Sequence, residues 1–173
     1  DEILGGIFMP GDGAADPSGV TYMLAKAAKK EGAQIFEKSP VDEIITKNGK
    51  IAGVKVNGQV IECEYIVLAS GMWSRQIGEK AGVNIPLYPA EHFYIITEPI
   101  ENLSKTLPTI RDFDNRTYIK EDAGKLLVGI FEANSIPAFN KTDKVPEDFS
   151  FGEFPENFEH FEPYLNAAVK RFP

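Results

Sequence analysis

Apolar residues recur at intervals of three and four positions after residue 17, and this spacing predicts an amphipathic helix. Asp16 is a suitable N-cap, Pro17 fits the first helical position, and Gly32 ends the pattern. The side of the helix expected to face the core comprises Val20, Met23, Leu24, Ala27 and Ala28. The preceding residues 5–13 are rich in glycine and predict a loop.

Short apolar runs follow this helix and predict a small antiparallel meander. They cover residues 33–36, 41–46, 51–56 and 60–64. Asn48-Gly49 and Asn57-Gly58 lie between the later runs, and Asn-Gly pairs favour the primed turns of β-hairpins. Residues 65–69 form a more continuous apolar run, which predicts a buried strand.

The run from Ile66 to Ser74 leads from that buried strand into a helix expected over residues 72–82. The core side of this helix is expected at Met72, Ile77 and Ala81. The turn consists of Ala69, Ser70 and Gly71, and small residues let a backbone approach a bulky ligand closely. A buried strand that ends in such a turn is typical of nucleotide-cofactor sites in open α/β sheets. No G-x-G-x-x-G follows a strand in this sequence, so the residues predict only part of such a site.

The pattern after Pro86 is mostly that of β-structure. Strands or extended segments are expected at residues 87–97, 116–120 and 126–131, a loop at 99–108, an irregular acidic segment at 137–155 and a short helix at 163–172. The turn between the later two strands falls at residues 121–124. Together the two halves predict an α/β protein of mixed α+β character that contains parts of two lobes.

Composition narrows the class of protein. The 173 residues carry a net charge of −8, which argues against a surface for nucleic acid or an anionic membrane. The single cysteine, Cys63, excludes an internal disulfide and fits a reducing compartment. No apolar run approaches the roughly 20 residues of a membrane span. The chain begins at Asp1 and stops at Pro173 directly after a helical pattern, so we expect a segment of something longer.

The order of these motifs resembles the D-amino-acid-oxidase-like superfamily of FAD-dependent amine oxidoreductases. The resemblance is carried by the Asp16-Pro17 helix, Gly32-Ala33, Val41-x-x-Ile44, Gly53-Val54 and the run from Ile66 to Trp73. Within the superfamily, the sequence resembles the dimethylglycine and sarcosine dehydrogenase branch. This closer resemblance is carried by Gly71-Met72-Trp73, Ala90-Glu91-His92-Phe93-Tyr94, Thr97-Glu98-Pro99, Tyr118-Ile119-Lys120-Glu121 and the run from Leu126 to Glu132. The sequence departs from the pattern at Ser70, where Ala or Thr is usual, and at Lys120, where Arg is commoner.

The resemblance implies an interior fragment with three parts. Residues 10–86 correspond to part of a Rossmann-like FAD/NAD(P)-binding domain with a β-meander, residues 87–155 to a mostly antiparallel substrate-binding lobe, and residues 156–173 to the start of a helical return. In the family the glycine fingerprint and the histidine that carries covalent FAD lie upstream of these residues. A further FAD-binding strand lies downstream. The chain alone is therefore not expected to hold FAD tightly.

The resemblance also implies residues that contact FAD. The backbone of Val41 would bracket the adenine, Ala69, Ser70 and Gly71 would lie against the cofactor, and Trp73 would pack beside it. The residues alone leave a plainer interpretation open, in which Val41 is a core strand residue and Trp73 fills the core.

His92 and Tyr118 match the catalytic histidine and tyrosine of the family. An imidazole can accept a proton from a substrate ammonium or orient a neutral amine, and a phenol can hydrogen-bond the substrate. The plainer alternatives are a surface or structural histidine and a tyrosine at the rim of a sheet. No metal site is expected, because His160 has no partner of ligand spacing in the sequence.

The implied activity is oxidation of an N-methyl amino acid of the dimethylglycine or sarcosine type, by hydride transfer to FAD. The resulting iminium would be hydrolysed or passed to tetrahydrofolate in another domain. Cytoplasm is the expected compartment, with the mitochondrial matrix as the alternative. A different class of function remains open: a non-catalytic binding module that uses the acidic, phenylalanine-rich residues 145–163 as a docking surface. Partly buried aromatic residues in a long loop explain that segment more simply.

Overall fold

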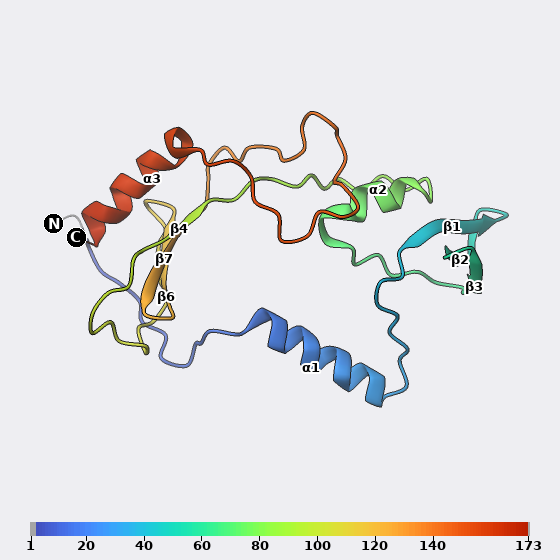
Figure 1. Ribbon diagram of the computed structural model, residues 1–173, viewed down its shortest axis with the longest axis horizontal. Helices are drawn as coiled ribbons and strands as arrows, with labels where there is room; N and C mark the ends of the chain where they lie inside the picture. Colours follow the sequence, from blue (N-terminus) through green and yellow to red (C-terminus); the bar gives the residue numbers. More distant parts are fainter. Residues whose placement is uncertain (1–2, 173) are drawn as a thin grey trace. The chain divides into compact units, whose positions relative to one another are not determined.

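The computed structural model describes residues 3–172, which form two compact units (Figure 1). One unit consists of residues 37–93 and 130–166 and carries His92. The other consists of residues 3–36, 94–129 and 167–172 and carries Tyr118. Both are mixed α/β with antiparallel sheets, which confirms the predicted fold class. Within the described residues no helix is long and apolar enough to cross a membrane.

The predicted meander forms the sheet of the first unit. Strands β1 (Val41–Lys47), β2 (Lys50–Val56) and β3 (Gln59–Glu62) pair antiparallel in that order. Asn48 and Gly49 have φ values of 53° and 71°, and Asn57 and Gly58 have 50° and 77°. Two successive positive φ angles are what a primed hairpin turn requires, so the turn prediction is confirmed.

The strand predicted at residues 65–69 is absent, and that prediction is wrong. Tyr65 and Val67 are 89% and 90% exposed, and no regular structure spans residues 65–70. An apolar run becomes a strand only when a neighbouring strand accepts its backbone hydrogen bonds, and no described strand pairs with this segment. For the same reason residues 33–36 form no strand.

The helix expected over residues 72–82 is shorter than predicted. A 3₁₀ turn, η1 (Gly71–Trp73), leads into α2 (Ser74–Glu79). The buried residues are Ser74 and Gly78, whereas Met72 is 37% exposed. A Cβ on Gly78 would lie 2.7 Å from Cγ1 of Ile85, so only glycine allows this close approach.

The second unit contains a four-stranded antiparallel sheet in the order β4-β7-β6-β5. Its strands are β4 (Tyr94–Ile96), β5 (Ile110–Asp112), β6 (Thr117–Asp122) and β7 (Lys125–Ile130). Strand β7 ends at Ile130, the first residue of the other unit's second segment. The extended run predicted at residues 87–97 is thus a strand only at its end. The core of the unit is built from Ile119, Val128 and Ala168.

Two further helices complete the chain. Helix α1 (Pro17–Lys30) has the predicted cap, since the Asp16 carboxylate accepts hydrogen bonds from the backbone N–H groups of Ser18 and Gly19. Its expected core side is wrong, because no residue of α1 is buried. Helix α3 (Phe158–Arg171) begins before the predicted Pro163, because the Asn157 side chain accepts a hydrogen bond from the N–H of His160.

An ion pair stabilises the second unit and gives a test of its stability. The Arg171 Nε donates to Oδ2 of Asp112 at 2.9 Å, and the Asn115 amide donates to the same carboxylate at 2.7 Å. Burial tends to raise the pKa of Asp112, but the hydrogen bonds from Asn115 and the charge of Arg171 outweigh it and hold this pKa below its usual value. The ionised carboxylate therefore contributes stability at neutral pH, and the contribution is lost as the pH falls through the lowered pKa.

We expect Asp112→Asn to lower the free energy of unfolding of this unit by about 1.5 kcal/mol at neutral pH, because bonds to a charged acceptor become bonds to a neutral one. Urea unfolding of the two proteins across pH measures the difference. It should shrink below about pH 4, where the unfolded Asp112 takes up a proton. The exposed Asp114 offers a control as Asp114→Asn, and an equal loss in both variants would contradict this role.

Candidate functional site

The backbone around His92 is fixed by the segment that follows β7. The N–H of Glu91 donates to the carbonyl of Ile136 at 2.8 Å, and the N–H of Ile130 donates to the carbonyl of Phe93 at 3.3 Å. These two bonds lie on either side of His92 along the chain. His92 thus has a fixed backbone although it lies outside a regular strand.

Glu132 is the charged partner of His92. Its side chain is only 3% exposed, whereas that of His92 is 45% exposed. One carboxylate oxygen lies 3.3 Å from Nδ1 of His92, and the other accepts the N–H of Phe93 at 3.1 Å. Sequence reasoning missed Glu132, although a charged residue directly after an apolar strand was a visible signal. His92 therefore has a charged partner although its own side chain is exposed, and its catalytic role stays a prediction.

Aromatic residues and the start of α3 surround this pair. The rings of His92 and Phe131 have centroids 5.9 Å apart, and those of Phe93 and His160 are 5.2 Å apart. The N–H of Ala133, next to Glu132, donates to the hydroxyl of Tyr164 at 3.2 Å. The buried Nε2 of His160 has no hydrogen-bond partner among the described residues. The part of the chain that the structure describes contains no group of three or more His, Cys, Asp or Glu side chains that could hold a metal ion.

The turn of small residues leads into η1, whose first residue is Gly71. Gly71 has a φ of 55°, a left-handed conformation that favours glycine, and nothing lies within 4 Å of the place where its Cβ would be. Apart from its two chain neighbours, no described residue occupies the space beside Gly71. Contacts of Ala69, Ser70 and Gly71 with a cofactor stay a prediction.

Trp73 anchors the loop that contains Pro146. Its indole N–H donates to the carbonyl of Pro146 at 2.9 Å. The amide of Gln76 makes two bonds to the backbone of Val145, each 3.0 Å long. The polar edge of Trp73 is thus bonded within the chain, and a cofactor contact through the face of its ring stays a prediction.

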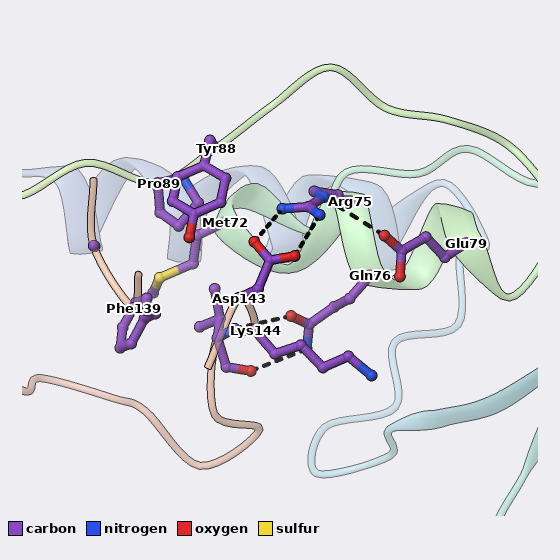
Figure 2. Close-up of a pocket in the computed structure, with 11 residues that line it drawn as sticks. Met72, Arg75, Gln76, Glu79, Tyr88, Pro89, Phe139, Asp143 and Lys144 are labelled. Carbon is purple, nitrogen blue, oxygen red and sulfur yellow. Dashed lines mark hydrogen bonds and ion pairs between the residues drawn. The ribbon is translucent and has the colours of Figure 1, made fainter. Parts of the chain in front are cut away.

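A shallow hollow lies beside this junction, and Figure 2 shows its lining. Arg75 donates two hydrogen bonds to Asp143, at 3.0 and 2.8 Å, and its guanidinium lies 5.4 Å from the centre of the Tyr88 ring. The bonds from Arg75 hold the pKa of Asp143 below its usual value and raise the pKa of Arg75. Arg75 and Asp143 neutralise each other, and their ion pair joins α2 to the loop that contains Asp143.

Val41 begins β1, and its carbonyl accepts a hydrogen bond from the Lys80 ammonium at 3.2 Å. The same ammonium donates to the carbonyl of Asp42 at 3.1 Å. Val41 is half-buried at the first position of β1, so it is a strand residue but does not belong to the buried core. The role of its backbone beside an adenine stays a prediction.

Tyr118 lies on β6 in the second unit, where its half-buried ring covers Gly129 of β7. A Cβ on Gly129 would collide with this ring. A glycine inside a strand pattern often marks such a close approach, so the run Leu126 to Ile130 contained the signal. His92 and Tyr118 belong to different units, and each stays a separate prediction.

The phenylalanine-rich segment is mostly an internal cluster. Phe139, Phe149 and Phe154 pack together with ring centroids 4.9 to 5.6 Å apart, and Phe161 is 3% exposed. Phe151 is fully exposed, and Phe158 is 60% exposed. Aromatic packing within the loop therefore explains most of this segment without a docking partner.

Comparison with known proteins extends this picture. The chain is 36% identical over 166 residues to 4-methylaminobutanoate oxidase (formaldehyde-forming) of Paenarthrobacter nicotinovorans, which covers 96% of the chain and 20% of that protein. It is 34% identical to the mitochondrial pyruvate dehydrogenase phosphatase regulatory subunit of Mus musculus and 34% identical to the mitochondrial sarcosine dehydrogenase of Homo sapiens. These matches cover 99% and 100% of the chain, and 20% and 19% of the two proteins. The chain spans about a fifth of the length of these curated relatives.

A solved structure agrees with these relatives. The crystal structure of L-proline dehydrogenase from P. horikoshii superposes with a TM-score of 0.70 at 26% identity, over 90% of this chain and 39% of that one. The family model described as FAD dependent oxidoreductase (DAO) matches residues 1–173. The chain therefore belongs to the DAO family of FAD dependent oxidoreductases.

Proposed function

We propose that the protein carrying this chain oxidises an N-methyl amino acid and uses FAD as the hydride acceptor. The observation that carries the proposal is the match of nearly the whole chain, at 36% and 34% identity, to a methylaminobutanoate oxidase and a sarcosine dehydrogenase. Both names denote enzymes that act on a methylamino acid.

The residues of the small turn fit a cofactor, because the space beside Gly71 is occupied by no described residue other than its chain neighbours. Val41, the turn residues 69–71 and Trp73 would hold FAD, which supplies the hydride acceptor when bound. This set is part of a cofactor site, with residues 10–86 as part of the FAD domain, 87–155 as the substrate lobe and 156–173 as the helical return.

The site at His92 supplies the proton chemistry. An amine substrate is largely protonated at neutral pH, and its nitrogen lone pair must be free before a neighbouring C–H bond can lose hydride. His92 accepts the proton from the substrate ammonium, and Tyr118 hydrogen-bonds the substrate. Loss of hydride leaves an iminium on the substrate. Water adds to this iminium and releases formaldehyde and the demethylated amine, unless tetrahydrofolate takes up the one-carbon unit.

The cellular compartment of the protein is also a proposal. Cytoplasm was expected from the sequence, but the mouse and human relatives are named as mitochondrial, which supports the matrix alternative. No nucleic acid enters the proposal, because the net charge of −8 repels it.

The direct test is anaerobic mixing of the purified flavoprotein with sarcosine, dimethylglycine or 4-methylaminobutanoate. At least one should bleach the flavin absorbance, and the unmethylated amino acid should not. A protein that binds FAD but is reduced by none of these amines would contradict the proposed substrate class. A protein that binds no FAD would contradict the proposal as a whole.

A further inference from the structure

We propose that Glu132 is a positioning residue that fixes the tautomer and the orientation of His92. The inference rests on the proposed function, in which His92 takes a proton from the substrate. Glu132 lies two positions beyond the end of β7, in the same compact unit as His92.

The first argument is the arrangement of donors and acceptors. An ionised carboxylate can only accept hydrogen bonds, so the Nδ1 that lies 3.3 Å from Glu132 carries the ring proton. The lone pair of the neutral ring is then on Nε2. His92 can therefore accept a proton at Nε2 while Glu132 holds Nδ1, the same division of roles by which a buried carboxylate orients a catalytic histidine elsewhere.

The second argument is that one carboxylate binds two adjacent residues. One oxygen faces the His92 ring and the other accepts the backbone N–H of Phe93. Rotation of the Glu132 side chain would break both contacts. At 3% exposure such a loss is costly, because water cannot replace the missing partner.

The third argument is that Glu132 itself is held on both sides along the chain. Ile130 donates its N–H to the Phe93 carbonyl, and Ala133 donates its N–H to the Tyr164 hydroxyl. Ile130 is completely buried. The carboxylate thus sits on a fixed backbone opposite the fixed backbone of His92, which is what precise orientation of the ring needs.

The fourth argument is electrostatic. When His92 takes a proton from the substrate it becomes a cation, and the negative charge of Glu132 beside Nδ1 stabilises that cation. The interaction is stronger than at an exposed site, because the Glu132 carboxylate is shielded from water. Glu132 therefore acts through His92 and needs no contact with the substrate.

Glu132→Gln is the decisive change, because it keeps the shape and removes one of the two acceptor oxygens. The NH₂ of the new side-chain amide must then face either the His92 ring or the Phe93 N–H, in place of an acceptor oxygen. We expect flavin reduction in the full-length flavoprotein to slow by about 10- to 100-fold, by analogy with the loss seen when the partner that orients a metal-binding histidine is removed. Glu156→Gln, at an exposed position, is the matched control and should leave the rate unchanged.

A double-mutant cycle separates positioning from a merely structural role. In a His92→Ala background, Glu132→Gln should change the rate of flavin reduction by less than about twofold, since no ring remains to be oriented. An equal loss in both backgrounds would overturn the inference, as would a normal rate for Glu132→Gln alone. If His92→Ala itself were as fast as the wild type, the role of His92 and with it that of Glu132 would be wrong.

A second readout does not depend on turnover. Diethyl pyrocarbonate acylates neutral imidazole nitrogen, and mass spectrometry reports the rate at His92 separately from other histidines. At about pH 8, where imidazole is mostly neutral, Glu132→Gln should slow acylation of His92 severalfold, because the ring loses the carboxylate that makes it more nucleophilic. An unchanged rate would overturn the inference. This result stands even if no amine reduces the flavin, so the inference and the proposed function can fail separately.

Discussion

Replacing His92 with alanine is expected to slow flavin reduction by an N-methyl amine about 100- to 10,000-fold, the usual contribution of a general acid or base. The reason is that the substrate ammonium would lose the group that accepts its proton. The variant should still fold, because the His92 side chain is 45% exposed and the backbone bonds of Glu91 and Phe93 do not need it.

Rapid mixing across a range of pH measures this effect. The loss should be largest where the wild-type rate depends on deprotonation of the substrate, and it should diminish in alkaline solution, where the free amine is present without a base. Lys105→Ala, in the exposed loop at residues 101–107, is a control that should match the wild type. A wild-type rate and pH profile in His92→Ala would show that His92 has no catalytic role.

Gly129→Ala is expected to lower the free energy of unfolding by about 3 kcal/mol, in the upper part of the range for overpacking a well-packed site. The added Cβ collides with the Tyr118 ring, and Gly129 is buried between neighbouring strands of the sheet. Relief of the collision requires the Tyr118 ring to move. The variant should therefore also bind the amine substrate more weakly, since Tyr118 is proposed to hydrogen-bond it.

Urea unfolding and the substrate dependence of flavin reduction measure the two effects. Gly13→Ala is the matched control, because nothing lies within 4 Å of the place its Cβ would take. In a Tyr118→Ala background, Gly129→Ala should lower stability much less than it does in the wild type, because the collision partner is gone. If Gly129→Ala were as stable as Gly13→Ala, the packing of Tyr118 over Gly129 would be wrong.

Short-range features of the fold were predictable from the residues. The Asp16 cap and the two Asn-Gly turns appear as expected, because each depends on a few neighbouring residues. The predicted strand at residues 65–69 failed for the opposite reason. Its apolar residues suit a buried strand, but strand formation depends on a partner elsewhere in the fold.

The candidate site shows the same difference between features set by neighbouring residues and contacts with distant ones. His92 and Tyr118 could be proposed from sequence motifs, and the family was recognised from their order along the chain. Glu132 and Gly129 each left a signal in the sequence, but neither signal identifies the residue that contacts it. Glu132 is 40 positions from its partner His92, and Gly129 matters only because a ring from the neighbouring strand lies over it.

Local residue order was thus sufficient for the family, the caps, the turns and the residues able to do acid–base chemistry. The fold was needed to show which of these residues are paired, buried or crowded. A hydrogen bond or a collision depends on distances of a few ångströms between side chains, and chain folding sets those distances without regard to their separation in sequence. For His92, the sequence shows the residue type, and only the fold shows the buried carboxylate of Glu132 beside its ring.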